Sequence, residues 1–154
     1  VDAPLIAASS STKNSTSSRH PEIHQTKNGN QWHHGMKAHI GADADSGLVH
    51  TVTTTAAHAH DIKQAHELLH REETDVFADS GYLGLEKRET VQDNDPEVNS
   101  HVAMMPSKGQ ALNKDTSMGA ILEKLEKTKA NIRVKVEQSF RVIKRQFGYV
   151  KVKY

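Results

Sequence analysis

Three carboxylates occupy positions from which the expected local structure can bring them together. Asp2 lies in the apolar segment 1–8, Asp79 ends the short apolar run 75–79, and Glu137 lies in the middle of a long helical pattern. If both strand ends lie beside that helix, the three carboxylates can share divalent cations. Two Mg²⁺ ions held in this way suit phosphoryl transfer, because one activates the attacking water or hydroxyl and the other stabilises the leaving oxygen.

Basic residues surround the third carboxylate. Arg133, Arg141 and Lys144 recur at helical spacing on a face with Glu137, and Arg145 follows directly. The net charge of the whole chain is only +1, but basic residues clearly outnumber acidic ones from Lys124 to Lys153. A localised basic face is typical of a protein that contacts nucleic-acid phosphates, although it can also be a solvated surface. We predict that these four cations bind the DNA backbone.

A second pattern points to a different class of enzyme. Residues 66–70 read HELLH, in which His66 and His70 would share one face of a helix, bind zinc, and leave Glu67 as the general base of a metalloprotease. The chain has 11 histidines, so a chance pair is expected, and no third ligand stands at a characteristic distance. We therefore keep a zinc metalloprotease only as a minor alternative, and expect both histidines to be structural.

The elements that position the carboxylates follow from the periodicity of apolar residues. Alternation over 35–42 and a β-branched run over 48–55, on either side of a turn-rich DADSG segment, predict a β-hairpin. Spacing and turn residues predict four further elements: a helix over 61–71 that begins at Asp61, a strand over 75–79, a short helix near 85–92 and a strand near 99–104.

A long final helix is predicted over residues 118–147. Its apolar stripe recurs at intervals of three and four residues and consists of Ile132, Val136, Phe140, Ile143 and Phe147. Strand, hairpin, helix, strand, helix, strand and final helix follow one another in this order. We expect an α/β fold with a mixed sheet and flanking helices, which places both strand ends beside the last helix.

Length and composition limit the remaining possibilities. A chain of 154 residues predicts one domain over 1–154, interrupted by a mobile Ser-rich loop at about 9–31. The absence of cysteine excludes disulfides, thiolate zinc sites and cysteine nucleophiles. The sequence contains neither a long apolar run nor a signal-peptide pattern, so we predict a cytoplasmic, nucleoid-associated protein with no membrane contact. Because Asp2 belongs to a strand already under way at Val1, we expect an N-terminally truncated fragment.

The segments carrying these residues resemble the DDE transposases of bacterial insertion sequences, in the branch grouped with insertion sequences four and five. The resemblance runs nearly end to end. Its segments are VDA (1–3), GNQW (29–32), GMKAHIG (35–41), SGLVH (46–50), FADSGY (77–82) and RVIKRQFG (141–148). Around its glutamate the family has tyrosine, two residues, arginine, three residues, glutamate, six residues and lysine. Arg133, Glu137 and Lys144 keep this spacing, and Ala130 stands in place of the tyrosine.

The resemblance implies a ribonuclease-H-like catalytic domain with Asp2, Asp79 and Glu137 as its catalytic and metal-binding acids. It implies Mg²⁺ or Mn²⁺ as cofactor, with two ions, and metal-dependent DNA strand cleavage and strand transfer at insertion-sequence ends. The implied partners are transposon-end and target DNA, and a homodimer is left open. Arg133 and Lys144 would then hold the DNA backbone or terminal base beside the scissile phosphate.

Two departures from the family pattern favour an alternative in which the chain is an inactive transposase remnant. Pro4 replaces the usual threonine two positions after the first aspartate, and Gln138-Ser139 follows the glutamate where His-Pro is common. Proline removes a hydrogen-bond donor from what should be a central strand. Such a remnant would fold and bind DNA weakly and without sequence preference. Convergence of Asp2, Asp79 and Glu137 is the structural feature that separates the active from the inactive interpretation.

Overall fold

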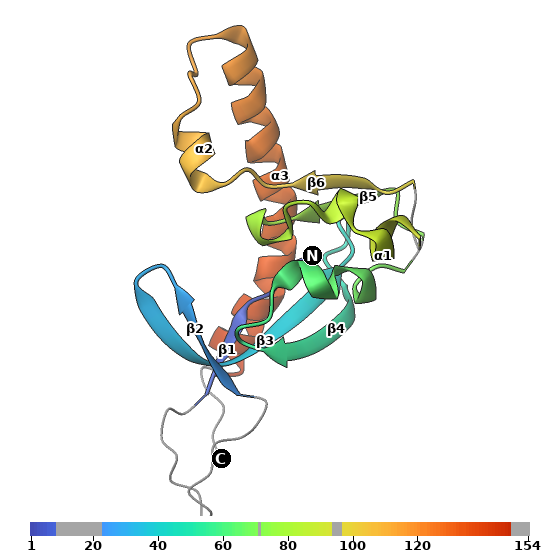
Figure 1. Cartoon of the computed structure of the whole chain (residues 1–154), viewed down its shortest axis with the longest axis vertical. Helices are drawn as coiled ribbons and strands as arrows, with labels where there is room; N and C mark the ends of the chain where they lie inside the picture. Colours follow the sequence, from blue (N-terminus) through green and yellow to red (C-terminus); the bar gives the residue numbers. More distant parts are fainter. Residues whose placement is uncertain (9–22, 71, 94–96, 149–154) are drawn as a thin grey trace, which may run out of the picture.

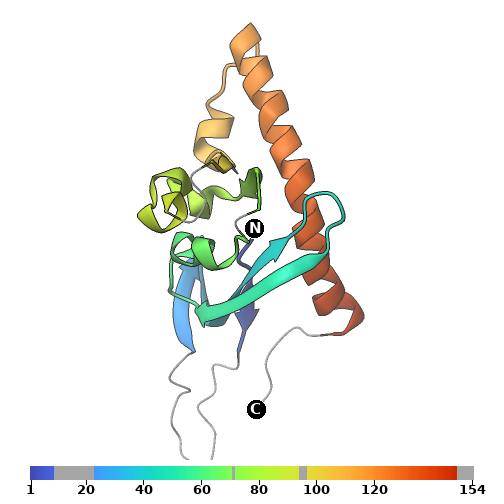
Figure 2. The same ribbon diagram turned by 90° about the vertical axis from the view of Figure 1, so that its right-hand side faces the viewer.

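A central sheet, several short helices and one long helix make up the chain. The computed structural model describes residues 1–8, 23–70, 72–93 and 97–148. The long helix α3 (Ser117–Arg141) runs along one side of the sheet, and its first half extends beyond the body together with α2 (Pro106–Gln110) (Figures 1 and 2). Within the described residues, no helix is both long and apolar enough to cross a membrane.

The central strand of the sheet is β3 (Gln31–Ala42), and its three partners are all antiparallel to it. These partners are β1 (Leu5–Ala7), β2 (His24–Asn28) and β4 (Val49–Ala56). The β3–β4 pair confirms the predicted hairpin, with Ile40 opposite Val52. β3 begins earlier than predicted because its first residues pair with β2.

β2 corrects one sequence-based prediction. We expected a mobile loop over about 9–31, but residues 24–28 form a strand and the chain turns at Gly29 to enter β3. The strand has no apolar alternation, since it reads HQTKN, and backbone pairing with β3 stabilises it instead. The first part of the predicted loop, 9–22, lies outside the described residues.

Two further strands pair in parallel, β5 (Asp75–Ala78) with β6 (Asn99–Val102). The start of the chain lies between them and the antiparallel sheet. The nitrogen of Val1 donates to the carbonyl oxygen of Phe77 at 2.7 Å, while Asp2 and Ile40 exchange backbone hydrogen bonds of 3.1 and 2.8 Å. This mixed α/β arrangement agrees with the predicted ribonuclease-H-like fold and places Asp2 next to the strand that leads to Asp79.

The predicted helix over 61–71 is instead a 3₁₀ helix, η1 (Asp61–Glu67). Ala65 and Leu68 are its fully buried contacts with the body, and Ile62 is partly buried. This spacing of three matches the three residues per turn of a 3₁₀ helix. The predicted short helix near 85–92 is divided into two turns that follow another 3₁₀ turn: η2 (Ser80–Tyr82), η3 (Leu85–Lys87) and α1 (Glu89–Gln92).

α3 confirms the long final helix, although its apolar stripe ends early. The Thr116 hydroxyl accepts a hydrogen bond from the Gly119 nitrogen at 3.1 Å and so caps the first turn. The α-helix passes into a π-helical turn, η4 (Val142–Gln146), after Arg141. Phe147 is 78% exposed, so the prediction that it belongs to a packed stripe is wrong.

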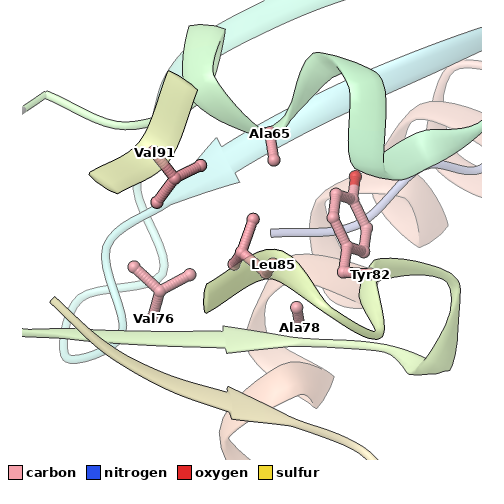
Figure 3. Close-up of a cluster of buried hydrophobic side chains, with 6 residues drawn as sticks. All are labelled: Ala65, Val76, Ala78, Tyr82, Leu85 and Val91. Atoms are coloured by element: carbon pink, nitrogen blue, oxygen red, sulfur yellow. The ribbon is translucent and has the colours of Figure 1, made fainter. Parts of the chain in front are cut away.

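Two clusters of buried apolar side chains hold these elements together. The first, shown in Figure 3, packs β5 against η1, η2, η3 and α1, and consists of Ala65, Val76, Ala78, Tyr82, Leu85 and Val91. The second joins α3 to the sheet, because Val136 and Phe140 pack on Ala38 and Ile40 of β3. Glu137 therefore has a fixed position relative to β3, since its neighbour Val136 is anchored in the core.

Candidate metal centre

Asp2 is held in place by backbone pairing with β3. Its Oδ1 accepts a hydrogen bond from the Ala3 nitrogen at 2.9 Å, which leaves Oδ2 available for a cation. Regular strand geometry is interrupted immediately afterwards at Pro4, whose carbonyl accepts from the Ala38 nitrogen at 3.1 Å. Proline has no N–H to donate in return, so the ladder loses one bond here, as the sequence predicted. Pairing resumes at Leu5, opposite Lys37.

Asp79 follows the last residue of β5 and caps η2. Its Oδ1 accepts from the Gly81 nitrogen at 2.7 Å. A Cβ at position 81 would lie 2.9 Å from Asp79 Oδ1 and 2.9 Å from Asp61 Oδ2, so a glycine is needed between these two acids. Asp79 is therefore a turn-capping residue. Capping occupies one of its oxygens and leaves the other available.

Glu137 projects from α3 and is paired loosely with a residue one turn earlier. Arg133 Nη2 lies 3.6 Å from Glu137 Oε1. The Arg133 side chain is 18% exposed and that of Glu137 is 54% exposed, so the cation is the more buried partner. Arg133 Nε is buried and has no hydrogen-bond partner within the described residues.

The charges of these residues influence one another. Burial raises the pKa of Asp2, and the carboxylates of Asp79 and Glu137 raise it further. Its hydrogen bond from Ala3 and the positive charge of Arg133 act in the opposite direction. Asp2, Asp79 and Glu137 come from positions far apart in the chain, yet the charges of the latter two both affect Asp2.

Sequence analysis missed three polar residues that adjoin this region. Lys37 Nζ lies 2.8 Å from Asp61 Oδ1 and 2.8 Å from the Ala59 carbonyl, and both charged side chains are mostly buried. The Tyr82 hydroxyl is buried without a hydrogen-bond partner among the described residues. Burial, followed by the charges of Asp61, Asp2 and Asp79, raises the pKa of Tyr82. A lysine within a largely apolar strand indicates a buried acidic partner, and Lys37 is the residue through which sequence analysis could have found this group.

The chemistry of these donors fits hard divalent cations. Carboxylate oxygens are the ligands that Mg²⁺ and Mn²⁺ prefer, and such ions retain several waters. The three acids do not form a group whose ligand atoms all lie within 4.8 Å of one another; the single such group in the described part of the chain lies elsewhere. Wider spacing is compatible with two ions about 3.5–4 Å apart that share the carboxylates. The Tyr82 hydroxyl and Arg133 Nε close to these acids are buried and have no hydrogen-bond partner in the described part of the chain.

The four predicted DNA-binding cations differ in exposure. Arg133 is mostly buried beside the acids, whereas Arg141, Lys144 and Arg145 are exposed at the end of α3 and in η4. The change from α-helix to π-helix within this segment alters the register of Lys144 and Arg145 relative to Glu137. DNA contact by these residues remains a prediction.

The HELLH segment does not form the helix that a metalloprotease site needs. η1 ends at Glu67, so His66 lies on the 3₁₀ helix and His70 lies beyond it. His66 Nε2 is 3.9 Å from Glu67 Oε1, whereas His70 contacts His50 and Thr51 of β4. The helical premise of the metalloprotease alternative is therefore wrong.

Comparison with known families agrees with this mixed α/β fold. The family described as "Transposase DDE domain" matches residues 1–154. The chain therefore belongs to the transposase DDE domain family, whose activity is of the polynucleotidyl transferase type and depends on divalent metal ions. No solved structure is a significant match to the chain.

Proposed function

We propose that the chain carries out metal-dependent DNA strand cleavage and strand transfer at insertion-sequence ends, with Asp2, Asp79 and Glu137 as the catalytic acids. The proposed cofactor is a pair of Mg²⁺ or Mn²⁺ ions. These ions would activate a water or 3′-hydroxyl and stabilise the leaving oxygen. The branch of the family that includes insertion sequences four and five is part of the same proposal.

The position of Asp2 beside the strand that leads to Asp79 is the observation that carries this assignment, because the Val1 nitrogen donates to the Phe77 carbonyl at 2.7 Å, two residues before Asp79. Burial raises the pKa of Asp2, and the charges of Asp79 and Glu137 add smaller contributions in the same direction. Carboxylates that repel one another in the absence of cations are arranged to bind them, because a divalent ion removes the repulsion and repays the desolvation of the acid. A purely structural cluster would have its acids neutralised by basic partners, and here Arg133 acts on Asp2 in the opposite direction to Asp79 and Glu137.

Several residues around the acids have supporting roles in this proposal. Lys37 forms an ion pair with Asp61 and so fixes the Asp61 side chain, which lies next to Gly81. The nitrogen of Gly81 donates to Asp79, so Asp61 would help to keep this capping interaction in place. Arg133 supplies a guanidinium with an unpartnered Nε that can donate to a phosphate oxygen. Arg141, Lys144 and Arg145 would extend the contact along the DNA backbone.

The proposal is tested by incubating the chain with supercoiled plasmid and Mn²⁺ or Mg²⁺ and measuring nicked product. A supercoiled plasmid reports strand cleavage without knowledge of the element ends. We expect Asp79→Asn and Glu137→Gln to lower the rate by at least about 100-fold, which corresponds to about 2.7 kcal/mol in the activation free energy.

Matched controls lie on the same elements. Asp75→Asn changes an acid at the other end of β5, and Glu123→Gln changes an acid near the start of α3. Both should retain the wild-type rate. A wild-type chain that folds and binds DNA but leaves the plasmid intact with either ion would favour the inactive-remnant alternative, to which the break at Pro4 already points.

A further inference from the structure

A second group of metal-ligating side chains lies near the beginning of β5. His50 belongs to β4, and His70 and Glu73 belong to the connection between η1 and β5. One ligand atom from each residue lies within 4.8 Å of the other two, and this is the only such group in the described part of the chain. None of the three residues has a role in the proposed DNA chemistry.

The two imidazoles are directed at each other. His50 Nδ1 and His70 Nε2 are in direct contact, and the Thr51 hydroxyl oxygen is 2.9 Å from each of these nitrogens. The ring centroids are 4.2 Å apart with an interplanar angle of 62°. Depending on the tautomers, one ring can donate its N–H to the other nitrogen, or both nitrogens can direct their lone pairs at a shared cation.

Glu73 is positioned by the backbone of the same connection. Its Oε1 and Oε2 accept from the His70 nitrogen at 2.8 and 2.9 Å, and Oε2 also accepts from the Glu72 nitrogen at 3.2 Å. These bonds hold the carboxylate beside the His70 ring. A carboxylate oxygen has two lone pairs, so these contacts leave it able to bind a metal.

A glycine provides the space for the His50 ring. A Cβ at Gly41 would lie 2.6 Å from His50 Cε1 and 2.8 Å from the Leu68 carbonyl oxygen. Gly41 stands on β3 next to the strand that carries His50, so its missing side chain lets the ring lie against the sheet. The packing of His50 is therefore specific to this position.

A cavity of about 380 Å³ adjoins the three side chains and gives an ion and its waters access from solvent. Its lining includes His50, His70 and Glu73, and it reaches Arg133 on α3. Glu73 precedes β5 and Asp79 follows it, and a strand of four residues separates its ends by about 10 Å. Glu73 and the proposed catalytic Asp79 therefore lie at opposite ends of β5.

We propose that His50 Nδ1, His70 Nε2 and Glu73 bind one Zn²⁺ or similar late first-row divalent ion, with water from the cavity completing the coordination. Imidazole ligands favour such ions over Mg²⁺, and a set of two histidines and one glutamate with an open position is a common zinc environment. The ion would tie β4 to the connection that leads into β5. This inference does not rest on the proposed function, since it requires neither DNA nor Asp2, Asp79 or Glu137.

The test uses Co²⁺ and Zn²⁺ as probes on the full chain. Co²⁺ bound in a four-coordinate site produces an intense visible absorption, and calorimetry gives the Zn²⁺ stoichiometry and affinity. We expect one Zn²⁺ per chain, a visible Co²⁺ spectrum, and a loss of affinity of at least about tenfold in His50→Ala, His70→Ala and Glu73→Gln. Zn²⁺ should raise the Tm of the wild type but not of the histidine variants.

His60→Ala is the matched control, because His60 is an exposed histidine close in sequence to the same elements. It should bind Zn²⁺ as the wild type does, and so should Asp79→Asn, which tests independence from the catalytic acids. Circular dichroism checks that each variant is folded. Zn²⁺ affinity and Tm shift that are the same in His50→Ala and His70→Ala as in the wild type would overturn the proposal, as would a site lost in Asp79→Asn.

Discussion

The two ends of β5 differ in the ligands they bring together. After the strand, Asp79 and its neighbours provide carboxylate oxygens from the start of the chain, β5 and α3. Before the strand, His50, His70 and Glu73 provide two imidazoles and one carboxylate. The first set suits hard ions that bind phosphate, and the second suits zinc-like ions. The two proposed metal sites would therefore lie at opposite ends of one short parallel strand.

The acids and the histidine group also differ in the contacts that fix their positions. The acids depend on long-range backbone pairing, because Asp2 is placed by Ile40 and Asp79 by the strand that bonds to Val1. The histidines lie closer together in sequence and depend on side-chain contacts with Thr51 and Glu73. Disturbing the sheet should therefore affect the acids more than the histidines.

The largest expected effect is a difference in DNA-nicking activity between variants at the two ends of β5. Asp79→Asn should reduce Mn²⁺-dependent plasmid nicking by at least about 100-fold, whereas a His50→Ala/His70→Ala double variant should stay within about twofold of wild type. Initial rates at saturating Mn²⁺, with zinc removed by prior dialysis, measure both. Equal losses in the two variants would mean that the ends of β5 do not act separately.

Two glycine substitutions test whether the two proposed metal sites are independent, because each places a Cβ against a ligand of one site only. Gly81→Ala brings a Cβ to 2.9 Å from Asp79 Oδ1 and should weaken Mn²⁺ binding by about tenfold. Gly41→Ala brings one to 2.6 Å from His50 Cε1, so it should weaken Zn²⁺ binding to a similar extent and lower stability by about 1–3 kcal/mol. Calorimetry with each ion on each variant gives four affinities. The comparison fails if either variant weakens both ions equally.

Asp2 and Asp75 should change the stability of the chain with pH in opposite directions. Burial, with the charges of Asp79 and Glu137, raises the pKa of Asp2 on folding. An acid with a raised pKa takes up protons as the chain folds, so its stabilising contribution is present at low pH and is lost as the pH rises through the folded-state pKa. Asp2→Asn should therefore raise the Tm of the metal-free chain at pH 7 by a few degrees.

Asp75 provides the contrasting case. Hydrogen bonds from His101 and Thr74 lower the pKa of Asp75, so its contribution is present above the unfolded-state pKa and is lost as the pH falls through the folded one. Asp75→Asn should lower the Tm at pH 7 slightly, because the side chain is exposed. Scanning calorimetry between about pH 4 and pH 8 compares the two variants with wild type. Tm changes of the same sign would contradict the difference in burial.

The smallest expected effect concerns the exposed cations beyond Glu137. Each cation that contacts a DNA phosphate releases counterions, so Lys144→Ala should reduce the slope of log affinity against log salt by about one unit. Sequence preference should not change. Lys127→Ala is the control on the projecting half of α3, where Lys127 pairs with Glu123. Fluorescence anisotropy without metal measures both, and identical slopes for Lys144→Ala and wild type would indicate a merely solvated face.

Much of the fold was predictable because its main elements carry clear periodicity. The β3–β4 hairpin has alternating apolar residues on both sides of a turn at Asp43–Gly47, where the Asp43 carboxylate accepts from Ser46. α3 has the buried pair Val136 and Phe140 at a spacing of four. β2 was missed because an edge strand of polar residues is stabilised by its partner's backbone, which local sequence does not reveal.

The two proposed sites were also predictable to different extents, because local sequence marks the acids but not the pairing of the histidines. Asp2 and Asp79 stood on predicted strands and Glu137 stood on the predicted final helix, so the three acids could be singled out, although their metal-binding role is untested. The histidine group was not predicted, because His50 and His70 meet across 20 positions and His50 has no distinctive local pattern. The HELLH pattern paired His70 with His66 instead, and the end of η1 at Glu67 shows why that pairing does not form.

Binding of Mn²⁺ tests the central claim most directly, because it depends on the three acids and needs no DNA substrate. Electron paramagnetic resonance of free Mn²⁺ during a titration gives stoichiometry and affinity for the wild type, Asp79→Asn and Glu137→Gln, with Glu123→Gln as control. We predict binding in the wild type and control that tightens as the pH rises and Asp2 ionises, and a loss of at least about tenfold in both site variants. Unchanged Mn²⁺ binding in Asp79→Asn and Glu137→Gln would contradict the assignment of these acids as the metal centre.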